Sequence, residues 1–220
     1  MRLSTASSNV RSSVGERPRL KQVERTALSD ARMFEAAIEL IIERGTHNTT
    51  LKEIGEKAGY SRGLASNRFG SKETLFSHLV RDFNEKWASE LRRFVGANSG
   101  VSAIEGALDA VEFFLLNRTG EMQAMYILWF ESITSYPVVR RRLAANHIAY
   151  RRDTARWLAQ GIADGDVRAS VDPDSFAVEF SAFIFGLVYQ WLASPSGIDL
   201  HAVLQHYRHN TLERLSNDTP

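Results

Sequence analysis

The chain has 220 residues, of which 44% are hydrophobic and 24% charged, and it contains no cysteine. This composition excludes wholesale disorder and collagen-like repeats, and the missing cysteines exclude disulfide frameworks and thiolate sites and fit the reducing cytoplasm. The formal net charge of +1 combines 17 Lys and Arg against 12 Asp and Glu in residues 1–95 with 10 against 14 in residues 96–220, which favours contact with nucleic acid through the basic front half alone.

Residues 1–22 are rich in Ser, contain five Arg or Lys residues and show no apolar period. Such a composition predicts a mobile basic arm. Two interpretations stay open, because basic arms of this kind either serve no purpose in binding or reach into the minor groove of DNA.

The first helix is predicted from apolar residues that recur at spacings of three and four between Leu28 and Ile42, and it ends at Gly45. A short second helix follows, because Thr50 and Glu53 have the spacing of a capping box. It lasts about two turns, since a small-residue turn begins at 58.

Two further helices complete the front half. Ser61 is predicted to cap a short third helix that runs to about Arg68. Ser71 opens a fourth helix with large apolar residues on one side, which runs to about Val95. Gly and Asn follow in residues 96–100, where a domain boundary is expected.

The back half is predicted to be helical throughout, over residues 101–117, 122–133, 138–162, 176–192 and from Leu200 onward. Asp172 and Pro173 form the expected entry to the helix over 176–192, which is apolar nearly all round and therefore needs cover on more than one side. Its most apolar stretch, 182–193, is shorter than the roughly 20 residues of a membrane span, so no membrane partner is expected. The sequence thus predicts an all-α fold of about nine helices.

Residues 49–75 have the pattern of a helix-turn-helix. Gly55 and Ala58 are small enough to let two helices cross closely, and Gly59 tolerates the backbone of a tight turn. Apolar anchors toward a core are also present at suitable spacing, namely Leu51, Ile54, Tyr60, Leu64 and Phe69.

The same segment resembles the DNA-binding domain of the TetR family of bacterial transcriptional regulators, over about residues 25–95. The matching residues are Gly45, Thr50, Ile54, the run Ala58-Gly59-Tyr60-Ser61, Gly63, Phe69, the run Ser71-Lys72-Glu73 and Leu75. The resemblance implies a homodimer that binds double-stranded operator DNA and is released by a small-molecule effector. Together with the composition, it predicts four parts: a disordered basic arm (1–22), a helix-turn-helix domain (23–70), a connecting helix (71–95) and an effector-binding and dimerisation domain (96–220).

One stretch departs from the family pattern, because residues 64–68 read Leu-Ala-Ser-Asn-Arg where a Leu-Tyr-x-His-like stretch is usual. Asn67 and Arg62 suit base edges, since Asn pairs with adenine and Arg with guanine in the major groove. Hydroxyl and cationic side chains nearby suit phosphate. The predicted DNA-binding residues are Thr50, Ser61, Arg62, Gly63, Ser66, Asn67, Arg68 and Lys72.

The aromatic residues of the back half suggest an apolar cavity between helices, which is the usual kind of small-molecule site. Its predicted walls are Phe113, Phe114, Tyr126, Trp129, Phe130, Trp157 and Phe183. A two-fold interface is predicted through the last two helices, where the pair Ala182 and Gly186 permits close approach. Its predicted residues are Phe180, Leu187, Trp191, Leu204 and Tyr207.

An enzyme is not expected, and neither a metal nor a cofactor is. The six histidines lack the Glu-x-x-His spacing of a di-iron bundle, and the motifs of nucleotide-binding loops and nucleophile elbows are missing from the sequence. Two alternatives to a ligand-responsive regulator stay open: a helical protein-interaction module and a helical-bundle enzyme without DNA specificity.

Overall fold

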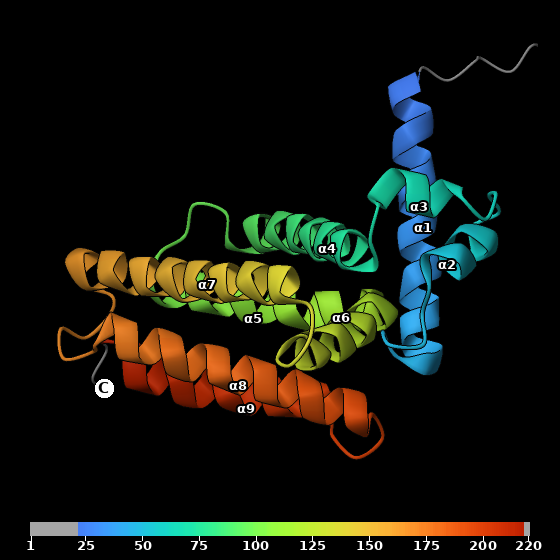
Figure 1. The fold of residues 1–220 in the computed structure, drawn as a ribbon. Helices are drawn as coiled ribbons and strands as arrows, with labels where there is room; N and C mark the ends of the chain where they lie inside the picture. The colour runs from blue at the N-terminus through green and yellow to red at the C-terminus, as the bar shows by residue number, and fades with distance from the viewer. Residues whose placement is uncertain (1–21, 218–220) are drawn as a thin grey trace, which may run out of the picture.

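The computed structural model describes residues 22–217, which fold into nine helices and contain no β-strand (Figure 1). The helices are α1 (Gln22–Arg44), α2 (Leu51–Lys57), α3 (Leu64–Phe69), α4 (Lys72–Val95), α5 (Gly100–Asn117), α6 (Thr119–Ser132), α7 (Pro137–Asp164), α8 (Pro173–Ala193) and α9 (Leu200–Leu215). The predicted all-α class is confirmed, and the predicted arm lies almost wholly outside the described residues.

The turn between α2 and α3 follows the residue pattern closely. Thr50 and Glu53 form the capping box at the start of α2, with the Glu53 backbone N–H donating to the Thr50 hydroxyl at 3.3 Å. At the other end Gly59 has a φ of 80°, and the Tyr60 backbone N–H donates to the Gly55 carbonyl at 2.9 Å. A left-handed glycine with this bond is the usual way to end a helix and redirect the chain.

The predicted cap of α3 is wrong. The helix begins at Leu64, its N-cap is Gly63, and no side chain caps it. Ser61 lies earlier, in a turn where its carbonyl accepts from the Leu64 backbone N–H at 3.0 Å. Because residues 61–63 form this turn instead of a first helical turn, the Ser61 hydroxyl remains at the surface.

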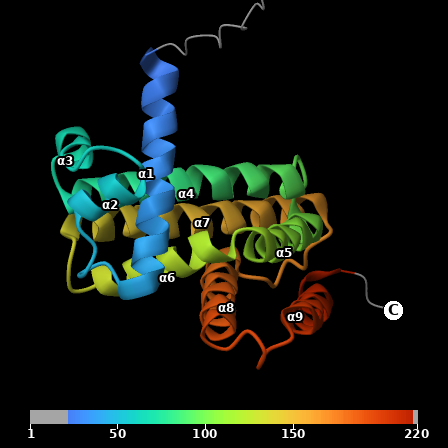
Figure 2. The same cartoon turned by 90° about the vertical axis from the view of Figure 1, so that its right-hand side faces the viewer.

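The nine helices form two parts that share α4. α1, α2 and α3 stand at one end, and the first turns of α1 project beyond the other helices in both views (Figures 1 and 2). In the larger part α4 lies on the opposite side from α8 and α9, with α7, α5 and α6 between them. Contacts of α4 with α5 and α7, of α7 with α8 and of α5 with α9 hold these layers together.

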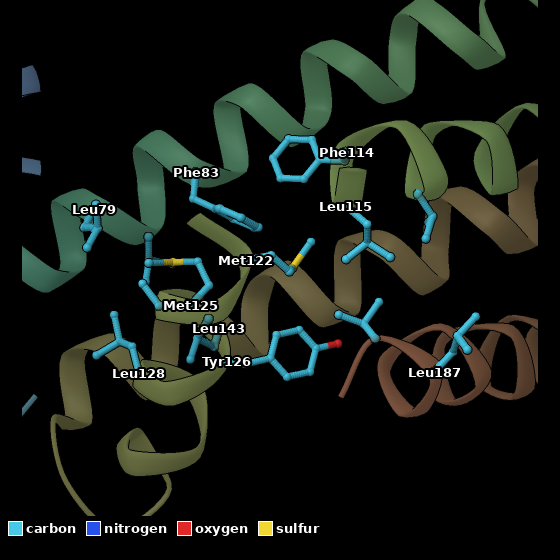
Figure 3. Close-up of a cluster of buried hydrophobic side chains, with 14 of the residues drawn as sticks. Leu79, Phe83, Phe114, Leu115, Met122, Met125, Tyr126, Leu128, Leu143 and Leu187 are labelled. Atoms are coloured by element: carbon cyan, nitrogen blue, oxygen red, sulfur yellow. The ribbon is translucent and has the colours of Figure 1, made fainter. Parts of the chain in front are cut away.

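One continuous core runs through both parts. Figure 3 shows its central region, where Phe83 of α4 faces Met122 and Tyr126 of α6, and Leu187 of α8 closes the far side. Because α4 contributes side chains from its first turn to its last, this helix is the structural link between the two parts.

Helix α8 begins as predicted, with the Asp172 carboxylate accepting from the Asp174 backbone N–H and Pro173 in the first turn. Among the described helices it is the one that is long and apolar enough to cross a membrane by length and composition. Core helices of soluble proteins pass the same test, so this property alone does not indicate a membrane span. Its inner face, which includes Phe176, is buried, whereas Val178 and Tyr189 on its outer face are 56% and 52% exposed. The helix therefore retains an apolar face that residues 22–217 do not cover.

Candidate nucleic-acid interface and ligand cavity

The outer face of the helix-turn-helix is polar. Ala65 and Phe69 anchor α3 in the core, and this leaves Ser66 and Asn67 exposed on the opposite side of the helix. Ser61, Arg62 and Gly63 are also exposed in the turn before it. These five predicted DNA-binding residues are exposed for two reasons: helical periodicity turns two of them away from the core, and the other three lie in a surface turn.

Arg62 is the most prominent cation of this surface, with 76% of its side chain exposed. Its Nε donates to the Glu56 carboxylate at 2.6 Å. An ion pair this exposed contributes only about 0–1 kcal/mol, so a phosphate or base edge can replace Glu56 at small cost.

The remaining three predicted contacts are engaged within the chain. The Thr50 hydroxyl is part of the α2 capping box, where its hydrogen bond lowers the pKa of Glu53. Arg68 forms a double hydrogen bond with Asp30 of α1 at 2.9 and 2.7 Å, and this partner raises the pKa of Arg68. Both side chains therefore have a structural role in the domain, and their contacts with DNA stay predictions.

Lys72 belongs to the junction between the two parts of the molecule. Its ammonium donates to the carbonyls of Thr46 and His47 at 2.7 and 3.2 Å, in the loop between α1 and α2. The Thr46 hydroxyl in turn donates to Glu131 of α6 and lies 3.2 Å from the hydroxyl of Tyr136. The structure therefore gives Lys72 a bridging role that the sequence did not predict.

Lys52 is a cation that the prediction omitted. It lies on the exposed side of α2, two residues after the cap, and it has no ion-pair or hydrogen-bond partner among residues 22–217. Its position in the first turn of α2, between Thr50 and Glu53, could have indicated from the sequence that this cation is exposed.

The larger part contains a cavity of about 90 Å³ between α4, α5, α6, α7 and α8. Three of the seven predicted wall residues, Tyr126, Trp129 and Trp157, line it. The full lining is Phe83, Trp87, Leu91, Ala107, Val111, Met122, Tyr126, Trp129, Tyr150, Thr154, Trp157, Phe180, Ser181, Ile184, Phe185 and Val188.

The other four predicted wall residues lie elsewhere. Phe114 is fully buried behind the wall, edge-on to Phe83. Phe113 packs against the guanidinium of Arg93, whose Cζ is 4.9 Å from the ring centroid. Neither ring lines the cavity as predicted, because Phe114 packs against the rings of Phe83 and Trp87 and Phe113 packs against Phe94 and Arg93.

Phe130 and Phe183 pair with other aromatic residues away from the cavity. Phe130 is 53% exposed and meets Tyr189 edge-on, and Phe183 stacks on Tyr207 of α9 with ring centroids 3.5 Å apart. These two predictions are also wrong, because an aromatic pattern does not fix which neighbouring helix covers each ring.

The cavity wall that the prediction missed comes mainly from α8, with five residues, and from α4, with three. Phe83 and Trp87 are four residues apart and so share a helix face, a periodicity that the sequence already displayed. Phe180 and Phe185 of α8 and Tyr150 of α7 complete the aromatic wall. Their participation depends on helix packing, for which the sequence has no simple signal.

The cavity is lined without charged side chains. The indole N–H of Trp129 in its wall is buried without a hydrogen-bond partner among the described residues, whereas three wall hydroxyls are bonded within the chain. The Tyr126 hydroxyl donates to the Phe185 carbonyl at 3.1 Å, and the Tyr150 hydroxyl donates to Asn84 of α4. Burial raises the pKa of both tyrosines above the ordinary value, so both hydroxyls keep their protons at neutral pH. The Thr154 hydroxyl donates to the Tyr150 carbonyl at 3.0 Å. The site is suited to an uncharged ligand or to one bound through aromatic faces.

The predicted dimer residues divide into two groups. Phe180, Leu187 and Leu204 are buried within the chain, so they cannot pack against a second copy, and this corrects the prediction. Trp191 and Tyr207 are half-buried. The open outer face of α8 instead carries Val178, Ala182 and Tyr189, with Gly186 half-buried beside them and free space where a β-carbon would stand.

The histidines of α9 have separate partners. His201 lies 2.7 Å from Glu112, and His209 lies 3.3 Å from Glu213. No group of three or more potential metal ligands comes together within the described part of the chain.

Two family descriptions match this chain. "Bacterial regulatory proteins, tetR family" matches residues 34–79, and "BetI-type transcriptional repressor, C-terminal" matches residues 102–215, which is more than half of the chain. The first match covers the helix-turn-helix and the second covers the part that contains the cavity.

Individual proteins show more distant similarity. The HTH-type transcriptional regulator BetI of Paraburkholderia phymatum is 27% identical over 126 residues, which cover 56% of this chain and 61% of the relative, less than two thirds of its length. The HTH-type transcriptional repressor KstR2 of Rhodococcus jostii is 22% identical over 188 residues, covering 84% and 90%. A transcriptional regulator from Saccharomonospora viridis, solved in complex with choline, shares the fold with a TM-score of 0.73 at 22% identity, covering 87% and 100%.

Proposed function

Because the chain belongs to the TetR family of bacterial transcriptional regulators, we propose that it is a dimeric repressor whose binding to operator DNA is weakened by a small apolar or aromatic effector. The observation that carries this proposal is the pairing of an exposed polar reading surface on α3 with an aromatic cavity, joined by one helix. Such a protein acts in the cytoplasm, where the DNA is.

The DNA contacts that we propose are the members of the predicted set in α3 and the turn before it, apart from Arg68, which is hydrogen-bonded twice to Asp30. Arg62 and Asn67 read base edges in the major groove, while Ser61 and Ser66 donate to phosphate. Gly63 allows the backbone to approach the DNA, since it has no side chain at the start of α3. Thr50, Arg68 and Lys72 position this surface through their hydrogen bonds within the chain.

The effector that we propose is small and uncharged, because the lining of the cavity is uncharged and mainly aromatic. A cavity of about 90 Å³ is smaller than the roughly 300–1,000 Å³ of typical ligand pockets, so a drug-sized effector must push helices apart as it enters. Binding of the effector in the cavity would therefore move helices, and such a movement could change how the protein binds DNA.

A small organic cation is a second candidate effector. Aromatic faces attract cations, and the cavity has eight aromatic side chains in its wall. The similarly folded Saccharomonospora viridis protein was solved with choline. Choline and its uncharged isostere, in which carbon replaces nitrogen, separate the two candidates in a titration of tryptophan fluorescence: tighter binding of the isostere supports the apolar effector.

The mechanism that we propose has two states and is transmitted by α4. This helix begins at Lys72, against the loop between α1 and α2, and places Phe83 and Trp87 in the cavity wall. An effector that enters favours a tilted α4 and with it a different placement of α3. The shift cannot exceed the differential affinity of the effector for the two states, typically about 1–3 kcal/mol.

The dimer is proposed to form through the exposed face of α8 together with α9. A two-fold axis would present two α3 helices about 34–36 Å apart, which fits successive major grooves and a pseudo-palindromic operator. Repression is the favoured outcome because a dimer seated on an operator blocks polymerase without any further contact. The domain division at about residues 70 and 95 is part of this proposal.

A gel-shift titration with DNA from upstream of the protein's own gene tests the function. We expect specific binding that weakens as salt rises, because phosphate contacts release counterions. Replacement of Arg62 by Ala is expected to weaken it further.

Binding without preference over bulk DNA would overturn the proposal and favour a protein-interaction module. Turnover of a substrate by the purified protein would favour a helical-bundle enzyme. A thermal-shift screen of small molecules, followed by release of DNA, then identifies the effector.

A further inference from the structure

We propose that the hydrogen bond from Tyr150 to Asn84 is the link through which the cavity controls the position of α4, and that the effector acts by taking the Tyr150 hydroxyl for itself. This inference rests on the proposed function. It makes Tyr150 a positioning residue and gives the effector one required feature, a hydrogen-bond acceptor on an otherwise apolar body.

The contacts between α4 and α7 single out this bond. Three hydrogen bonds join α7 to α4. The Val138 backbone N–H donates to Glu73 at 2.6 Å, and Arg142 donates to Ser77 at 3.0 Å. The third is the bond from Tyr150 to Asn84. The first two lie near the DNA-binding end of α4. Among these partners only Tyr150 also lines the cavity, so this is the one of the three bonds that involves a residue of the cavity wall.

The other polar groups of the wall do not offer such a link. The Tyr126 hydroxyl bonds to a backbone carbonyl of α8, and the Thr154 hydroxyl bonds to a carbonyl of its own helix. Neither bond involves α4. Loss of the Tyr150 hydrogen bond therefore differs from loss of the Tyr126 or Thr154 bond, because it loosens α4, the helix that directly follows α3 in the chain.

Replacing Asn84 by a ligand acceptor costs less free energy than breaking the Tyr150 hydrogen bond without a replacement. A buried hydroxyl that loses its partner costs free energy, so an apolar ligand that displaces nothing leaves the bond in place. A ligand with a carbonyl or ether oxygen beside Tyr150 offers a replacement acceptor and frees Asn84. Effectors with such an oxygen are therefore expected to release DNA, whereas apolar ligands of the same shape bind without doing so.

The test needs no effector, because substitution can remove the bond directly. Full-length Tyr150→Phe and Asn84→Ala are compared with Tyr126→Phe, which removes the same hydroxyl from the same cavity but from a bond to α8. Operator affinity is measured by fluorescence anisotropy on the protein's own upstream DNA, and the melting temperature of each variant is measured in parallel.

We expect Tyr150→Phe and Asn84→Ala each to lower operator affinity about two- to tenfold, the equivalent of one hydrogen bond, while Tyr126→Phe leaves it unchanged. The double variant Tyr150→Phe/Asn84→Ala is expected to bind like the single variants, since one bond is lost in all three. The melting temperature distinguishes a merely structural role, which would lower stability equally for both tyrosines without separating their affinities.

Equal affinity of the Tyr150→Phe and Tyr126→Phe variants would overturn the inference, as would additive effects in the double variant. Failure of the wild-type protein to bind its upstream DNA would instead overturn the proposed function. The two failures are therefore distinguishable in one experiment.

Discussion

At the scale of single residues, the proposed DNA-reading surface depends on side chains that the fold does not need for its own stability. Arg62 is held by Glu56 through an exposed ion pair, and Asn67 projects from α3 without a partner among the described residues. Arg68, one position further on, is committed to Asp30. Two neighbouring residues of α3 thus differ: Arg68 is bonded within the chain, and Asn67 is free for the DNA contact that we propose.

Replacing Arg62 or Asn67 by Ala is expected to lower specific operator affinity by about 1–3 kcal/mol each, the typical value of a bidentate base contact. Arg152→Ala is the matched control, because Arg152 is an equally exposed arginine, paired with Asp153 on α7. Anisotropy titrations in which all three variants bind like wild type would contradict this assignment.

Two glycines of the helix-turn-helix should respond differently to Ala. A β-carbon on Gly55 would lie 3.2 Å from the Ser61 carbonyl, where α2 meets the turn before α3, whereas one on Gly63 would lie 3.9 Å from Asn67. We expect Gly55→Ala to destabilise the fold by about 1–3 kcal/mol through overpacking. Gly63→Ala should melt close to wild type yet bind operator more weakly, and the reverse pattern would exclude a close backbone approach at 63.

His147 predicts a pH dependence of stability. Burial, reinforced by nearby Arg151, lowers the pKa of His147, which stacks on Phe185 with ring centroids 4.7 Å apart. Below the ordinary value of about 6.5 the unfolded chain binds more protons at this site than the folded chain, so the free energy of unfolding falls as pH decreases. His147→Phe should reduce the drop in melting temperature between about pH 7.5 and about pH 5.5. An unchanged drop would show that His147 does not contribute.

At the scale of elements, α4 connects everything that the proposed switch requires. Its first turn meets the loop after α1, its middle lines the cavity, and Lys86 ties it to α6 through Glu121 at 2.9 Å. Tyr136, at the start of α7, has a φ of 55° and contacts Thr46 and Phe76. A non-glycine residue in this conformation persists where its surroundings hold it firmly.

Lys72→Gln should separate a junction role from a phosphate contact. Loss of a phosphate contact lowers the slope of log affinity against log salt by about one. Because Lys72 donates to the carbonyls of Thr46 and His47, we expect weaker operator binding and a lower melting temperature with an unchanged salt slope. A reduced slope at wild-type stability would return Lys72 to the DNA contacts.

The elements themselves were largely predictable, because their signals are local. Capping residues at Thr50, Ser71 and Asp172 and the turn glycine Gly59 fix where helices begin and end. Which rings line the cavity depends on how distant helices pack, and this is why Phe183 was placed in the wall although it stacks on α9. Similarly, the partner of Arg68 is a residue 38 positions away, which no spacing rule indicates.

At the scale of the whole molecule, the division of charge matches the division of tasks. The basic front half contains the proposed DNA-reading surface, and the acidic back half contains the cavity and the exposed apolar face of α8. Repulsion between the back half and the DNA phosphates favours binding in one orientation. A two-fold dimer would repeat this arrangement so that both reading surfaces face the same side.

The oligomeric state tests the uncovered face of α8. Val178→Asp and Tyr189→Asp place a charge on this face and should convert a dimer into a monomer in sedimentation experiments at micromolar concentration. Val23→Asp is the control, because Val23 is 80% exposed on α1, in the other part of the molecule. A wild-type protein that sediments as a monomer would exclude this interface.

The most direct test of the central claim, that a two-fold dimer reads an operator through two α3 helices, is a hydroxyl-radical footprint on the protein's own upstream DNA. We expect two protected half-sites related by a pseudo-palindrome and centred about 10 base pairs apart or a multiple of that spacing, with both lost in the Arg62→Ala variant. Protection of a single half-site, or uniform protection without sequence preference, would contradict the account.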